Sequence, residues 1–185
     1  MSPTQIQITF LSVIAGGLVA LAGTFSRCVS RKRDPLSTEG ARRFGGRFNP
    51  VDTSALYLSS TPTLAVAVAL GLADIYGVTR FNPRLLVSVR VSLGALLDLT
   101  SAKTRRQLGL SKADLLIDWR IDPVAAITQR IGAQAQAEGV EGILFPSRIE
   151  NKASNLCVFR ENLLATSVIA VEGYDDVFPL AGEGA

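Results

Sequence analysis

Short apolar segments, separated by helical segments of unequal length, constrain the fold of this chain most. The run LLVSVRV at 85–91 alternates apolar and polar side chains, which is typical of a strand with one buried face. Further short strands are predicted at 56–59, 96–100, 142–145, 156–159 and 167–171. Because helices interrupt these strands irregularly, the pattern predicts a single α+β domain with short mixed strands and flanking helices.

Two internal helices are predicted, and each begins at a proline. Thr61 is expected to cap a helix that starts at Pro62 and runs through the alanine-rich segment after it. The second helix is predicted at 122–139, where Asp122 is the expected cap and Gly139 follows the last turn.

The segment 1–26 carries no charged side chain. We expect an apolar helix packed on the domain, in which Ser2 caps the first turn, and the domain itself then covers 27–173. An alternative is a signal or membrane anchor in 8–25, which would make the protein exported or membrane-attached. The stretch has no basic residue on its N-terminal side, which argues against a secretory signal. The acidic, glycine-containing end at 174–185 is predicted to be a flexible tail.

The chain contains no histidine, and this excludes several enzyme classes at once. Ser-His-Asp and Cys-His nucleophiles, HExxH metalloproteases and histidine-ligated zinc all require that residue. The two cysteines, Cys28 and Cys157, are too few for a disulfide framework and form no CxxC pair. We therefore expect no metal and no prosthetic group, and we predict a reducing, cytoplasmic location.

Arginine is concentrated in one irregular segment. Seven of the nineteen basic residues lie between Arg27 and Arg47, in a stretch rich in glycine and proline. The planar guanidinium binds phosphate oxygens two at a time, so two arginines from different segments suit a pyrophosphate. A solvated basic loop remains the alternative. No aromatic residues alternate with these basic ones as a nucleic-acid stacking platform requires, so direct nucleic-acid binding is not expected.

Three further positions are candidates for ligand contact. Gly46 precedes Arg47 and allows a close approach of the backbone. Tyr57 lies in a predicted strand and can stack on a ring, although a core tyrosine with a satisfied hydroxyl explains it equally well. Ser147 follows a buried-type strand, where it is either a hydrogen-bonding ligand contact or an ordinary turn residue.

These residues occur in runs that resemble one family. Arg27, GARRFGGRFNP (40–50), ALYLSSTP (55–62), FPSR (145–148) and NLCVF (155–159) together resemble a RES domain over 27–171. The family comprises NAD-degrading toxins of toxin–antitoxin systems, similar in fold to ADP-ribosyltransferases. The resemblance implies an enzyme that cleaves the nicotinamide–ribose bond of NAD⁺, its substrate, with inorganic phosphate or water as acceptor.

The resemblance also assigns roles to residues. Arg27 and Arg47 would hold the NAD phosphates, and Arg47, Tyr57 and Ser147 would form the catalytic set. Tyr57 would pack on the nicotinamide–ribose end, and Ser147 and Asn155 would contact the ligand from the far strands. The implied partner is a helical DNA-binding antitoxin; self-association into a homo-oligomer stays open.

One family residue is missing. The RES glutamate belongs on the helix after the Tyr57 strand, and Val68 occupies that position. Either Glu39 or Asp74 substitutes for it, or the chain is a catalytically weak homologue that binds NAD or another nucleotide.

Overall fold

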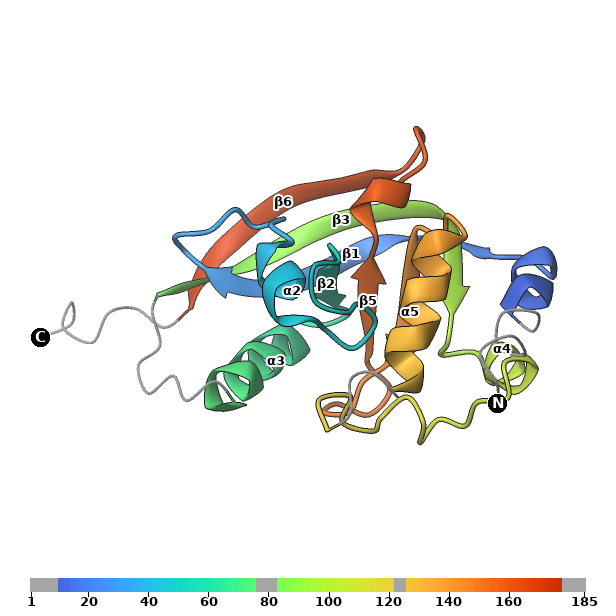
Figure 1. The fold of residues 1–185 in the computed structure, drawn as a ribbon. Coiled ribbons are helices and arrows are strands. Elements are labelled where there is room, and N and C mark those ends of the chain that lie inside the picture. The colour runs from blue at the N-terminus through green and yellow to red at the C-terminus, as the bar shows by residue number, and fades with distance from the viewer. Residues whose placement is uncertain (1–9, 76–82, 122–125, 178–185) are drawn as a thin grey trace, which may run out of the picture.

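The computed structural model describes residues 10–75, 83–121 and 126–177. It is a single α+β domain, which confirms the predicted fold class (Figure 1). The strands are β1 (Val19–Ser30), β2 (Leu56–Ser59), β3 (Arg84–Asp98), β4 (Gly142–Pro146), β5 (Ser154–Val158) and β6 (Val168–Val177). The helices are α2 (Glu39–Phe44), α3 (Pro62–Ile75), α4 (Ala102–Gln107) and α5 (Ile127–Ala137), with a short 3₁₀ helix at Arg160–Asn162.

The sheet closes on itself. Its strand order is β1-β2-β5-β4-β3-β6, and β1 also pairs with β3, so β1 to β5 form a ring. All pairings are antiparallel except that of β3 with β4. The long strands β1, β3 and β6 make one curved layer, and α5 lies across the shorter strands (Figure 1). This closure places β1 between β2 and β3.

Two hydrophobic clusters stabilise the fold. One packs α5 against the sheet and includes Phe48, Ile131 and Phe145. The other is built from strand side chains such as Leu56 and Val89. Along β3, alternate residues are buried while Ser88 and Arg90 between them are exposed. The predicted alternation at 85–91 is therefore confirmed.

The strands predicted at 85–91 and 96–100 are one strand rather than two. At the bend between them, the carboxylate of Glu141 accepts hydrogen bonds from the N–H groups of Gly94 and Ala95, both at 2.7 Å. Glu141 is fully buried and also accepts the N–H of Leu164 at 3.1 Å. A buried carboxylate thus satisfies the backbone donors that the bend in β3 leaves free.

The predicted N-terminal helix is wrong over most of its length. Residues 10–15 are helical, the chain then turns at Gly17 with φ +110°, and 19–30 form β1. β1 pairs with β3 from Val19↔Leu96 to Ser30↔Arg84, and this long-range pairing overrides the helical tendency of the uncharged sequence. A membrane helix through 8–25 is contradicted by the same pairing. No helix within the described ranges has the length and apolarity that crossing a membrane requires.

The predictions for the other elements hold with shifted ends. The strands at 56–59, 142–145 and 156–159 are confirmed, and Thr61 caps α3 by accepting the N–H of Leu64 at 3.1 Å. The last strand begins at Val168 and runs through 174–177, so these residues are paired strand rather than flexible tail. Helix α5 begins at Ile127; the predicted cap Asp122 lies outside the described residues.

Candidate functional site

The predicted ligand residues meet at one cavity of about 580 Å³. Its size is within the usual range for small-molecule sites. The lining side chains come from β1, the loop after α2, β2, α3, and the ends of β4 and β5. They include every position that the sequence analysis placed on the ligand: Arg27, Arg47, Tyr57, Ser147 and Asn155, together with Val68.

Arg27 projects from β1 and is largely buried. Its Nη1 donates to the carbonyl of Pro35 at 2.6 Å, which fixes the chain that follows β1. Burial lowers the pKa of Arg27 to about 10, while nearby Asp34 acts in the opposite direction. The guanidinium therefore stays protonated at neutral pH, in surroundings where its charge is poorly screened.

Arg47 is held by a distant loop. Its Nη1 donates to the carbonyls of Leu115 at 2.6 Å and Ile117 at 2.8 Å. Burial lowers the pKa of Arg47, and repulsion from Arg148 lowers it further. Within the described residues only Nη1 of Arg47 has a hydrogen-bond partner, so Nε and Nη2 can bind a ligand.

The hydroxyl of Tyr57 already has two hydrogen-bond partners within the protein. It donates to Asn49 Oδ1 and accepts the N–H of Phe48, both at 2.8 Å, and burial raises its pKa well above the ordinary value. A Cβ on Gly46 would lie 2.6 Å from this hydroxyl and 2.5 Å from Asn49 Oδ1, so only glycine fits there. Tyr57 therefore fixes the loop that carries Arg47, and the ring, not the hydroxyl, is left to contact a ligand.

Ser147 closes the turn after β4. Its Oγ accepts the N–H groups of Ile149 and Glu150, each at 3.0 Å, as a turn residue does. It nevertheless lines the cavity, and its hydroxyl hydrogen has no acceptor in the described part of the chain. Both interpretations of Ser147 are therefore compatible with its position.

Asn155 pairs with Ser59 across β5 and β2. The hydroxyl of Ser59 donates to Asn155 Oδ1 at 2.9 Å. This bond occupies the acceptor of the amide, so its N–H groups are oriented to donate elsewhere. At the cavity wall they can bind an oxygen of a ligand.

Helix α3 presents an apolar wall to the cavity. Ala65, Val68, Ala69 and Leu72 line it, at the spacing of one helical face. Val68 thus faces the cavity at the position where the resemblance places a glutamate. Among the described residues, no aspartate or glutamate lines the cavity.

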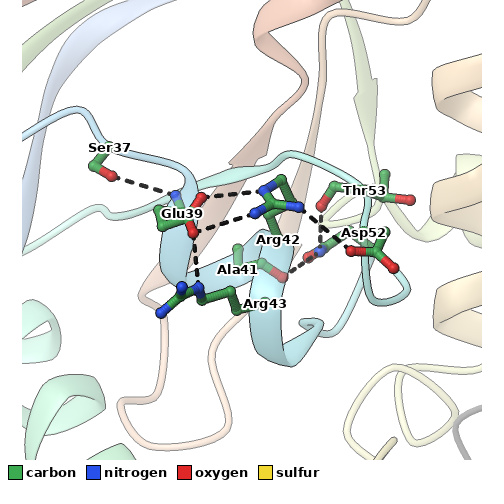
Figure 2. Close-up of polar contacts among 8 residues, drawn as sticks. Ser37, Glu39, Ala41, Arg42, Arg43, Asp52 and Thr53 are labelled. Carbon is green, nitrogen blue, oxygen red and sulfur yellow. Dashed lines mark hydrogen bonds and ion pairs between the residues drawn. The ribbon is translucent and has the colours of Figure 1, made fainter.

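Glu39, one of the two proposed substitutes, does not fill this gap. Glu39 is not a lining residue, and its carboxylate binds Arg42 at 3.1 Å and Arg43 at 2.8 Å, as Figure 2 shows. The hydrogen bond from Arg42, above all, lowers the pKa of Glu39. The structure therefore does not bring Glu39 to the site, and the side chain of Asp74 lies outside the described residues.

The lining residues that sequence reasoning missed include Trp119, Arg120 and Arg148. Arg148 ends the run FPSR and could have been found from that neighbourhood. Trp119 and Arg120 lie in a segment without helical or strand periodicity, so no signal marked them. Arg120 binds Asp118 at 2.7 Å, and this hydrogen bond is the main reason that the pKa of Asp118 falls to about 2.

The fold and the cavity define a single-domain α+β protein with a small-molecule site in which arginines face an apolar helix. Comparison with known proteins gives the family. The model of the RES domain matches residues 24–179, and the chain belongs to the RES domain family. The resemblance read from the sequence is confirmed.

The chain is also similar to individual proteins, in sequence and in structure. The NAD(+) phosphorylase MbcT of Mycobacterium bovis and that of Mycobacterium tuberculosis are each 31% identical over 139 residues, covering 72% of this chain and 72% of the relative. A chain in the crystal structure of the M. tuberculosis MbcT–MbcA toxin–antitoxin complex superposes with a TM-score of 0.75 and 26% identity. The match covers 91% of both chains.

Proposed function

We propose that this chain is an NAD-degrading toxin that binds NAD⁺ in the cavity and cleaves the nicotinamide–ribose bond. One observation carries the proposal: residues from three strands and two loops, selected by their likeness to a RES domain, line the same cavity. Inorganic phosphate is the acceptor that we propose, because the relatives named above are NAD(+) phosphorylases.

Charge complementarity supports the binding mode. The pyrophosphate carries two negative charges, and Arg27 and Arg47 offer two guanidiniums from separate elements of the cavity wall. Each charge-assisted hydrogen bond contributes about 1.5–3 kcal/mol where water is excluded. In the proposed mode the ring of Tyr57 packs on the nicotinamide end, and Ser147 and Asn155 donate to ribose or phosphate oxygens.

Phosphorolysis of NAD⁺ requires little covalent chemistry from the protein. A phosphate oxygen forms a bond to C1′ of the nicotinamide ribose while the bond from C1′ to the ring nitrogen breaks. The bonding pair stays with nitrogen, so nicotinamide leaves as a neutral molecule and ADP-ribose 1″-phosphate forms. The protein's part is to hold the phosphates and to position the acceptor.

A weakly catalytic binding protein is the second candidate, and Val68 favours it specifically. A valine can neither stabilise positive charge developing on C1′ nor orient the acceptor. Loss of such a group costs roughly 10²–10⁴ in rate. The proposed toxin is therefore slow compared with a relative that has the glutamate.

A protein partner and a location complete the proposal. We propose a helical DNA-binding antitoxin as partner, since the structural neighbour comes from a toxin–antitoxin complex. The substrate is a cytoplasmic metabolite, so we propose a cytoplasmic location.

Incubation of the purified chain with NAD⁺, with and without phosphate, tests the activity. The proposal predicts nicotinamide in equal amount to ADP-ribose 1″-phosphate, detected by mass spectrometry, when phosphate is present. Release of ADP-ribose in its place identifies water as the acceptor. Intact NAD⁺ after prolonged incubation leaves the binding protein as the better description.

A further inference from the structure

We infer that the cavity selects against positive charge on its ligand. It binds a dinucleotide with an uncharged nicotinamide ring, or ADP-ribose without the ring, more tightly than NAD⁺. The inference rests on the proposed function, because it specifies which form of the dinucleotide the same site prefers.

The protein neutralises the cationic side of the cavity only in part. Four arginines line it, Arg27, Arg47, Arg120 and Arg148. Asp118 pairs with Arg120, but the other three form no ion pair with the described residues. Arg148 lies close enough to Arg47 to make its protonated form less favourable. The lining therefore holds an excess of positive charge.

The opposite wall supplies no compensating charge. Val68 and its neighbours on α3 are apolar, and the described lining contains no carboxylate. Two carboxylates act on the arginines from outside the lining: Asp34 raises the pKa of Arg27, and Asp118, which pairs with Arg120, raises that of Arg47. Glu150 and Glu39 serve other partners, since Glu150 accepts the hydroxyl of Thr61 at 2.9 Å and Glu39 binds Arg42 and Arg43. A cationic ring entering this cavity consequently meets more positive than negative charge, because four arginines and no carboxylate are among the described lining residues.

The ligand's two ends respond oppositely to such a field. The pyrophosphate of NAD⁺ is attracted by the guanidiniums, whereas its pyridinium ring is repelled. The ring is uncharged in the reduced dinucleotide and absent from ADP-ribose, so these ligands keep the attraction and lose the repulsion. One like charge about 10 Å away, at the effective dielectric of a partly buried site, changes affinity by about tenfold.

This selectivity has a consequence for turnover. The product of NAD⁺ cleavage has lost the ring cation, so the cavity holds it more tightly than the substrate. Inhibition by ADP-ribose, which is the phosphorolysis product without its 1″-phosphate, is therefore expected at concentrations below those at which NAD⁺ saturates the site.

Calorimetry with a matched ligand pair tests the inference. Carba-NAD⁺ cannot be cleaved, and carba-NADH differs from it by one hydride and the ring charge. The full chain should bind carba-NADH and ADP-ribose about tenfold more tightly than carba-NAD⁺, and added salt should narrow the difference. Val68→Glu should reduce or reverse the difference in affinity between carba-NADH and carba-NAD⁺. Val68→Gln introduces a side chain of the same size as glutamate but without its charge, and should leave this difference unchanged.

Equal affinities of the wild type for carba-NAD⁺ and carba-NADH would overturn the inference and leave the proposed function intact. If the ratio of the affinities for carba-NADH and carba-NAD⁺ does not change with salt, the preference is not electrostatic. The same conclusion follows if the ratio is equal in Val68→Glu and Val68→Gln. Absence of binding by all three ligands would overturn the inference and the proposed function together. Should circular dichroism show that Val68→Glu does not fold, Arg148→Gln replaces it, and an unchanged ratio there also overturns the inference.

Discussion

At the scale of single residues, one glycine and one tyrosine decide where Arg47 lies. The absent side chain of Gly46 lets the Tyr57 hydroxyl reach Phe48 and Asn49, and Asn49 in turn binds the carbonyls of Ala41 and Thr53 at 2.9 and 2.8 Å. Contacts within the protein thus fix the conformation of the run GGRFNP, in addition to any contact that it makes with a ligand.

Gly46→Ala should destabilise the domain, because the new Cβ would lie within 2.7 Å of two Tyr57 atoms and an Asn49 atom. Crowding of this kind typically costs about 1–3 kcal/mol. Chemical denaturation should show a lower free energy of unfolding. The matched control is Gly40→Ala, since nothing lies within 4 Å of a Cβ at that helical position. Equal stability of both variants would contradict the proposed role of Gly46.

Val68→Glu should raise the rate of NAD⁺ cleavage by about tenfold or more, since it returns a carboxylate to the wall of the cavity. Single-turnover measurement of nicotinamide release gives the rate. Val68→Gln is the control and should not reproduce the gain. The gain in rate is smaller if the apolar wall keeps the new carboxyl group protonated. In that case the cleavage rate of Val68→Glu should rise with pH. No gain at any pH would show that Val68 does not occupy the glutamate's position.

At the scale of elements, the site depends on two supports away from the cavity. Helix α5 touches the loop of Phe48 so closely that a Cβ on Gly132 would lie 1.8 Å from the Phe48 carbonyl oxygen. Glu141 holds the bend of β3, which lets one strand pair with β1, β4 and β6.

Glu141→Gln should destabilise the fold at neutral pH by about 1–3 kcal/mol, because an amide accepts the three backbone N–H groups less strongly. Burial alone raises the pKa of Glu141, but hydrogen bonding outweighs it, first from the Ser167 side chain and then from the N–H groups of Leu164, Ala95 and Gly94. The pKa of Glu141 therefore lies below the ordinary glutamate value of 4.5. The charged form is thus favoured in the folded state. Its contribution is complete above pH 4.5 and is lost as pH falls through the lower folded pKa.

Denaturation curves across the acid range check this prediction. The difference between wild type and Glu141→Gln should be constant near neutrality and shrink below pH 4.5. Glu138→Gln, at the exposed end of α5, is the control variant, and a surface substitution of this kind should change the free energy of unfolding little at neutral pH. A difference that grows with acid would contradict the sign of the shift.

At the scale of the whole molecule, the sequence predicts the elements better than their connections. The alternation in β3 and the Thr61 cap are local signals, and both predictions are confirmed. β1 was misassigned because its strand conformation comes from pairing with β3 some sixty residues away, which no local pattern encodes. The merging of two strands at Gly94 depends equally on a distant residue, Glu141.

The candidate site also combines features that local sequence predicts with features that depend on distant residues. Arg27, Arg47, Tyr57, Ser147 and Asn155 were recognisable because each lies in a run of family-like sequence, and they share one cavity. Their hydrogen bonds were not predictable, since the partners of Arg47 are carbonyls in a segment without periodicity. Trp119 and Arg120 reach the cavity through that same segment.

The most direct test of the account is calorimetric titration of carba-NAD⁺ into the wild type, Arg47→Ala and Arg43→Ala. Arg43 is an exposed arginine on α2 that pairs with Glu39 and lies outside the cavity. Arg47→Ala should weaken binding at least tenfold, a loss of about 1.4 kcal/mol, and Arg47→Lys should restore only part of it. Thermal melts must confirm that each variant is folded, because Arg47 also anchors 115–117. Arg43→Ala should bind like the wild type. Two results would contradict the placement of the ligand in this cavity: an equal loss of affinity for carba-NAD⁺ in Arg47→Ala and Arg43→Ala, or an unchanged affinity in a folded Arg47→Ala variant.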